Sequence, residues 1–252
     1  MTIMKLAIAG TYSSGKTLTS YALSHLTGIP RTRARTMREL LPFAVPGKTL
    51  EECTAAELVQ LIVRRHVERC VHESHLTEGF ISDGSSLQEW IYGAVRVIVG
   101  INPNASILLG DLETVERTEE LRFFEEIMAQ LGVAIKQHVG DTYQAFVHLP
   151  NELTLAKDGH RPVNERFRSM ADEAIGREID ALGIPRYVIG GSLPERLGGI
   201  VEQFGFEVTM TVEEAIARAQ EEYRAVDMTI ESDRAWATNT EEPVAVSSGS
   251  PA

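Results

Sequence analysis

The chain has 252 residues, of which 43% are hydrophobic and 24% are charged. This composition is typical of a soluble globular protein and excludes collagen-like, low-complexity and largely disordered classes. No apolar run approaches the about 18 residues of a membrane span, and the short apolar N-terminus lacks a signal-peptide cleavage site. Two cysteines, Cys53 and Cys70, are too few for a disulfide framework, so we expect a cytoplasmic protein.

The net charge of −12 is distributed unevenly along the chain. Residues 1–38 contain six Lys and Arg residues and no Asp or Glu, so this segment is +6 and the remainder carries −18. The overall acidity argues against a nucleic-acid partner, and no segment suggests a membrane partner. The basic opening segment therefore needs an explanation of its own.

Strand and helix patterns alternate along the chain. In chain order, the patterns predict a strand at 5–9, helices at 17–26 and 54–75, a strand at 79–83, helices at 87–99 and 114–131, a strand at 145–149, a helix at 163–182, a strand at 186–189, and helices at 194–204 and 212–226. Thr54 and Glu57 form a capping box, and Gly132 is expected to end its helix. The alternation predicts an α/β fold with a mainly parallel sheet. We expect one domain over residues 1–237 and a disordered tail over 238–252.

A phosphate-binding loop follows the first predicted strand and opens the first predicted helix. It matches the pattern G-x-x-x-x-G-K-[ST] with Gly10, Thr11, Tyr12, Ser13, Ser14, Gly15, Lys16 and Thr17. In this motif backbone N–H groups surround a phosphate chain, helped by the helix N-terminus. Lys16 is expected to contact the β- and γ-phosphates, and the Thr17 hydroxyl to bind Mg²⁺. The motif predicts a nucleoside triphosphate with Mg²⁺ and an α/β P-loop NTPase fold.

An acidic residue, Asp83, ends the second predicted strand. At that position a carboxylate can order Mg²⁺ or take the proton from an attacking hydroxyl. The alternative is that Asp83 or Ser85 only caps the next helix. Asp111 is a competing acid for the metal, although a turn residue is the preferred interpretation there.

Several segments together resemble a known family. They are the P-loop, Ser82-Asp83-Gly84-Ser85-Ser86, Asp158-Gly159-His160-Arg161 and Gly190-Gly191-Ser192-x-x-x-Arg196. In these the chain resembles the AAA-28 type of P-loop ATPase, a group similar to the nicotinamide-riboside kinase domain of the bifunctional NAD-biosynthesis regulator. The resemblance implies a small-molecule kinase-like fold and ATP- and Mg²⁺-dependent phosphoryl transfer to a small metabolite. The alternative is a nucleotide-binding regulatory ATPase with little or no kinase activity.

Arginines follow the glycine turn at residues 158–159, in a segment at about 151–170 that we expect to be a lid. Arg161, with Arg166, is predicted to neutralise the charge on the transferring phosphoryl group. The alternative is a surface helix whose arginines form salt bridges.

The basic opening segment and the last glycine turn complete the candidate site. Arg31, Arg33, Arg35 and Arg38 are candidates for binding a small, anionic or nucleoside-like acceptor; the alternative is a basic patch that pairs with acidic residues. Ser192, Leu193 and Pro194 are candidates for packing against adenine, and Ser192 also suits a helix N-cap. A homodimer is one assembly that the sequence allows.

Overall fold

The computed structural model describes residues 4–102, 115–153 and 165–225. Four strands are present in these residues: β1 (Lys5–Ala9), β2 (Phe80–Asp83), β3 (Ala145–His148) and β4 (Arg186–Val188). The helices are α1 (Lys16–Thr27), α2 (Met37–Ala44), α3 (Ala55–His75), α4 (Ser86–Val99), α5 (Glu119–Thr142), α6 (Glu165–Ala181), α7 (Leu193–Phe204) and α8 (Val212–Ala225). The predicted tail at 238–252 lies outside the described residues.

The strands form one parallel sheet in the order β2-β1-β3-β4, which confirms the predicted α/β fold. Ile8 of β1 pairs with Asp83 of β2, and Ala9 pairs with His148 of β3. The carboxyl ends of these three strands therefore meet at one edge of the sheet. The P-loop leaves β1 at this edge, where open α/β sheets place their sites.

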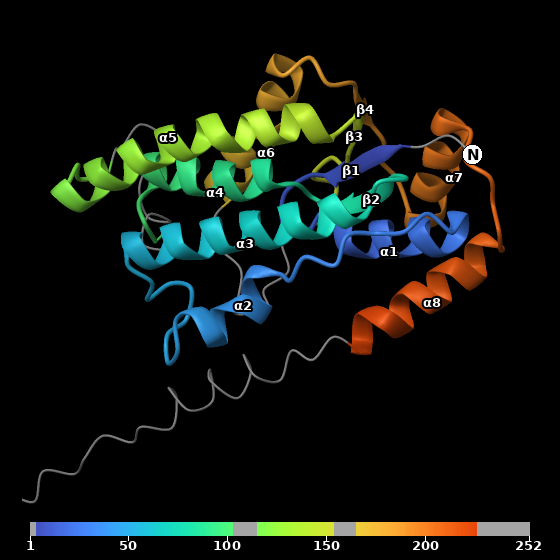
Figure 1. The fold of residues 1–252 in the computed structure, drawn as a ribbon, viewed down its shortest axis with the longest axis horizontal. Coiled ribbons are helices and arrows are strands. Elements are labelled where there is room, and N and C mark those ends of the chain that lie inside the picture. Colours follow the sequence, from blue (N-terminus) through green and yellow to red (C-terminus); the bar gives the residue numbers. More distant parts are fainter. Residues whose placement is uncertain (1–3, 103–114, 154–164, 226–252) are drawn as a thin grey trace, which may run out of the picture.

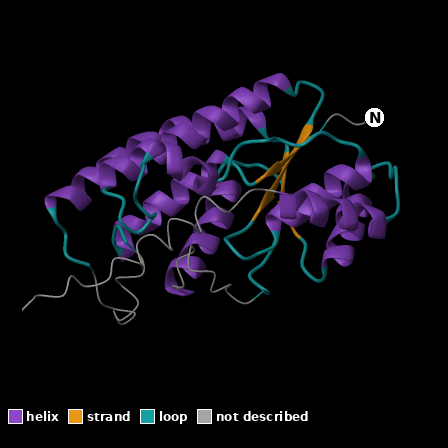
Figure 2. Cartoon of the chain, turned by 90° about the horizontal axis from the view of Figure 1, so that it is seen from below, coloured by secondary structure: helices purple, strands orange, loops and turns teal. Residues whose placement is uncertain are grey.

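Helices cover both faces of the sheet (Figures 1 and 2). On one face, α1 packs on the sheet and α8 packs on α1, and both share with α7 a buried cluster that includes Leu6, Ile8 and Leu23. On the other face, α3, α4, α5 and α6 pack around Phe80 and Phe146. Among the described helices, none combines the length and hydropathy required to cross a bilayer.

The helix α2 was not predicted, because the alternation of Arg31, Arg33 and Arg35 just before it is typical of an extended segment. Thr36 is the N-cap of α2, and its hydroxyl accepts a hydrogen bond from the backbone N–H of Glu39. The Glu39 carboxylate accepts one in return from the backbone N–H of Thr36. This is a capping box of the kind correctly predicted at Thr54 and Glu57. Arg38 is therefore helical rather than part of an extended run.

The helix α5 continues through Gly132, contrary to the prediction that this glycine ends it. A Cβ at Gly132 would lie 2.7 Å from Cε2 of Trp90. The Trp90 indole crosses α5 at this point, and its Nε1 donates a 2.6 Å hydrogen bond to the carbonyl of Met128. The close contact between α4 and α5 thus requires a glycine at position 132. The neighbouring residues in the sequence give no sign of this contact.

We expect Gly132→Ala to destabilise the fold by about 1–3 kcal/mol, because the added methyl must displace the buried Trp90 ring. Gly140 offers a matched control in the same helix, since a Cβ there would lie 4.0 Å from its nearest neighbour, Leu182. Gly140→Ala should be neutral or stabilise the helix by up to about 1 kcal/mol. Urea unfolding of both variants tests this. Equal effects of the two substitutions would contradict the assigned contact.

Candidate functional site

The P-loop has the backbone geometry of an anion-binding turn. Gly10, Ser13 and Gly15 have φ values of 136°, 61° and 87°. The Ser14 hydroxyl donates a 2.8 Å hydrogen bond to the carbonyl of Thr11, which closes the turn. Lys16 begins α1, and its Nζ donates to the same carbonyl at 2.6 Å. The turn thus closes on the Thr11 carbonyl and leads directly into the N-terminus of α1, as the motif predicts.

Asp83 lies against the start of α1. The Thr17 hydroxyl donates a 2.7 Å hydrogen bond to Oδ2 of Asp83. Of the two capping residues that the alternative allowed, Ser85 is the N-cap of α4 and Asp83 is not. The competing acid, Asp111, lies outside the described residues. Two predicted Mg²⁺ ligands, 66 positions apart in sequence, are therefore brought into direct contact.

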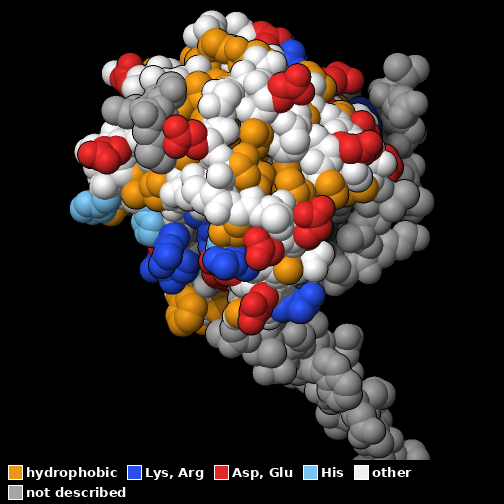
Figure 3. All heavy atoms as spheres, turned by 90° about the vertical axis from the view of Figure 1, so that its right-hand side faces the viewer, with side chains coloured by type: hydrophobic (Ala, Val, Ile, Leu, Met, Phe, Trp, Pro, Cys, Tyr) orange, Lys and Arg blue, Asp and Glu red, His pale blue; other side chains and the backbone are white. Residues whose placement is uncertain are grey.

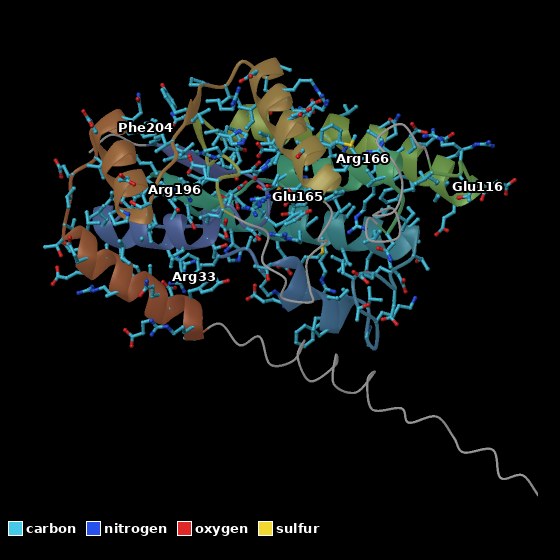
Figure 4. All side chains as sticks on the ribbon, turned by 180° about the vertical axis from the view of Figure 1, so that it is seen from behind. Arg33, Glu116, Glu165, Arg166, Arg196 and Phe204 are labelled. Carbon is cyan, nitrogen blue, oxygen red and sulfur yellow. The ribbon has the colours of Figure 1, made fainter. Side chains whose placement is uncertain are left out.

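Two buried arginines, Arg168 and Arg196, contact residues of the P-loop. Figure 4 labels Arg196 on α7. Arg196 donates from Nη1 to the carbonyl of Ser14 at 2.6 Å and forms a 3.4 Å ion pair with Glu152. Arg168 of α6 donates from Nη2 to the carbonyl of Leu153 at 2.8 Å, and its Nε lies 3.4 Å from the Thr11 hydroxyl. Sequence reasoning assigned neither contact. The available signal was Arg196 in the Gly190-Gly191-Ser192-x-x-x-Arg196 segment.

The predicted lid is described only in part. Residues 154–164, including Arg161, lie outside the described residues. Arg166 is half-buried in the first turn of α6 (Figure 4), two positions from Arg168. The roles of Arg161 and Arg166 stay predictions.

Aromatic rings fix the P-loop residue Tyr12 to the helices beside it. The ring of Tyr12 lies 6.0 Å from those of Tyr92 in α4 and Phe167 in α6, and these two are 5.9 Å apart. Burial raises the pKa of the Tyr12 and Tyr92 hydroxyls above the usual range of tyrosine, so both stay protonated near neutral pH. The cluster couples α4 and α6 to the phosphate loop.

The arginines of the basic segment separate from one another. Arg31 pairs with Glu222 of α8 and lies 3.5 Å from the ring centroid of Tyr21. Arg35 pairs with Glu68 of α3, whose hydrogen bond raises the pKa of this arginine. Arg33 is exposed. The ion pairs favour the alternative in which this segment pairs with acidic residues, and acceptor binding by these arginines stays a prediction.

Charge is distributed unevenly over the face formed by α7 and α8. Figure 3 shows acidic side chains scattered over it, while most Lys and Arg side chains gather near its lower edge. Acidic and basic side chains are therefore separated in space on this face, as they are along the sequence.

The turn at Gly190–Ser192 leads into α7, as predicted. Ser192 is the N-cap, and its backbone N–H and hydroxyl both donate to Oε2 of Glu195, at 2.7 and 2.6 Å. These hydrogen bonds lower the pKa of Glu195. The N-cap role is confirmed, while adenine packing by Ser192, Leu193 and Pro194 stays a prediction.

Comparison with known proteins identifies the fold. No protein-family model matches the chain, and no curated protein matches it. Two solved structures of deoxyadenosine kinase from M. mycoides are similar, one with the products dCMP and dCDP and one with dCTP. Each has a TM-score of 0.52, covers 80% of this chain and 99% of its own, and is 14% or 15% identical. The chain thus shares the P-loop NTPase fold of these structures, whereas the resemblance to the nicotinamide-riboside kinase domain stays a prediction.

Proposed function

We propose that this protein is a kinase that transfers the γ-phosphoryl group of ATP to a hydroxyl of a small, nucleoside-like metabolite. The observation that carries the proposal is the 2.7 Å contact between Thr17 and Asp83 at the mouth of the P-loop. In this proposal the Thr17 hydroxyl and the Asp83 carboxylate would bind Mg²⁺ beside the γ-phosphate, and their contact next to the P-loop supports that role. The fold shared with deoxyadenosine kinases supports a nucleoside-like acceptor.

The residues at this contact suit Mg²⁺. Hydroxyl and carboxylate oxygens are its preferred protein ligands, and one or two of them suffice because phosphates and water complete the coordination. The described residues contain no group of three or more His, Cys, Asp or Glu side chains fit to hold a metal, which agrees with a site of so few protein ligands. When bound, Mg²⁺ would neutralise charge that develops on the phosphates.

The chain's own residues supply positioning and proton transfer. The P-loop N–H groups and Lys16 would hold the β- and γ-phosphates, as the helix N-terminus favours anions. The acceptor oxygen attacks the γ-phosphorus, the bond from that phosphorus to the bridging oxygen breaks, and ADP leaves. Asp83 would accept the proton that the acceptor hydroxyl loses. Arg161 and Arg166 keep their proposed role on the transferring group.

Mass spectrometry of metabolite pools incubated with the protein, ATP and Mg²⁺ tests this function. We expect one compound, or a small set of related nucleosides, to gain one phosphate while ATP becomes ADP. Formation of AMP instead would indicate nucleotide or diphosphate transfer. ATP binding without any phosphorylated product would favour the regulatory ATPase.

A further inference from the structure

The helix α3 has an unusual distribution of charge. Its inward face buries Arg69 and Glu73, which are 2% and 4% exposed, whereas Val67 and Val71 are about half exposed on the outside. A surface helix normally shows the opposite arrangement. Burying a guanidinium is costly unless its donors are paired. The position of Arg69 therefore calls for a specific partner.

The partners of Arg69 are three consecutive residues at the end of β2. Its Nη1 donates to the hydroxyl of Ser82 at 2.6 Å and lies 3.3 Å from the carbonyl of Gly84. Its Nη2 donates to the carbonyl of Asp83 at 3.1 Å. One planar guanidinium thus holds the Ser82 side chain together with the backbone carbonyls of Asp83 and Gly84.

These carbonyls need such a partner because the sheet ends here. The backbone N–H of Gly84 donates to the carbonyl of Ile8 at 2.9 Å, and the register of β1 and β2 ends at Asp83. The chain then turns at Gly84, whose φ is 72°. Arg69 supplies donors to the carbonyls of 83 and 84, where no neighbouring strand does.

A buried network keeps Arg69 in place and balances its charge. The Ser82 hydroxyl lies 3.0 Å from that of Thr32 and 3.2 Å from that of Tyr143. The Tyr143 hydroxyl also donates to Glu73, and the carboxylate of Glu73 favours the charged form of Arg69. The network therefore joins α3 to the end of β2, the strand that follows it in the chain after the turn at 76–79 (Figure 1).

We propose that Arg69 is a positioning residue for Asp83. By fixing the Ser82 side chain and the carbonyls of residues 83 and 84, Arg69 sets the direction of the Asp83 carboxylate toward Thr17. Small displacements of a catalytic group have large effects on reactivity. This inference rests on the proposed function, since it gives Asp83 a role that demands exact placement.

The test measures Mg²⁺-dependent binding of a fluorescent ATP analogue rather than turnover. We expect Arg69→Lys to raise the Mg²⁺ concentration required for tight binding about tenfold, since an ammonium cannot replace the planar fork. Binding of the analogue in EDTA should change less than about twofold, because it depends on the P-loop and not on Asp83. Arg64→Met, which removes a charge from the same helix, should alter neither value.

Further variants separate the possible causes of failure. Asp83→Ala should also raise the Mg²⁺ requirement; if it does not, the proposed metal role of Asp83 fails. An unchanged Mg²⁺ requirement in Arg69→Lys beside an affected Asp83→Ala would overturn the positioning role alone. If Arg69→Lys lost as much analogue binding in EDTA as it does with Mg²⁺, the positioning role would be overturned as well.

If thermal unfolding shows that Arg69→Lys does not fold, Ser82→Ala replaces it. We then expect about a threefold rise from the loss of one hydrogen bond to Arg69, and no rise would overturn the proposal.

Discussion

Asp83→Asn is expected to reduce phosphoryl transfer about 10³-fold, within the range that a general base contributes. The substituted amide can still accept the hydrogen bond from Thr17, so the local structure should persist. It cannot accept a proton from the acceptor hydroxyl, however. Steady-state transfer to the acceptor identified by mass spectrometry, together with ATP affinity by calorimetry, gives the two measurements required.

The control for this prediction is Asp141→Asn. Asp141 is exposed near the end of α5, and the same chemical change there should leave transfer unaffected. ATP affinity should change less than about tenfold in either variant, because the P-loop supplies most phosphate contacts. If Asp83→Asn kept more than about one tenth of the activity, a role in proton transfer would be untenable.

The P-loop and Asp83 were predictable because their signals are local. The motif lies between an apolar run and a helical pattern, so strand, turn and helix are all encoded within a few residues. Asp83 ends an apolar run, and parallel strands bring their carboxyl ends together. The contact between Thr17 and Asp83 follows from this topology.

The partners of the buried arginines were not predictable in the same way. Arg196 reaches Ser14 across 182 positions, and Arg168 reaches Thr11 across 157. Arg196 stands out only as part of the Gly190-Gly191-Ser192-x-x-x-Arg196 segment, and nothing in the sequence near Arg168 distinguishes it from a surface residue. Arg69 also lies in a helix whose outward valines suggest the opposite orientation. Contacts of this kind depend on how the helices pack on the sheet, which local patterns do not encode.

Basic residues that are close in sequence in the opening segment do not form one charged surface in the structure. Arg31 and Arg35 alternate in sequence, which suggested one anion-binding surface. Their partners are Glu222 and Glu68, on helices α8 and α3 respectively. The acidic remainder of the chain thus supplies the counter-charges of Arg31 and Arg35, while Arg33 and Arg35 are both exposed.

Gly15→Ala is expected to weaken ATP binding about 100-fold, which corresponds to about 2.7 kcal/mol. Gly15 has a φ of 87°, and a Cβ there would lie 2.9 Å from Nη1 of Arg196. That guanidinium is buried and bonded to the carbonyl of Ser14, so the methyl must displace either Arg196 or the loop. Loss of a charged hydrogen bond accounts for about 1.5–3 kcal/mol, and the loop N–H groups lose their common direction as well.

The opposite end of α1 provides the matched control. Gly28 is the C-cap, with a φ of 72°, and a Cβ there would lie 3.6 Å from Thr209 in ordinary contact. Both substitutions force an alanine into the left-handed region, so each should destabilise the fold by about 1–2 kcal/mol. Only Gly15→Ala should lose ATP, as measured by calorimetry on folded protein. Equal ATP affinity in the two variants would mean that backbone strain alone, and not the contact with Arg196, sets the requirement for glycine in the P-loop.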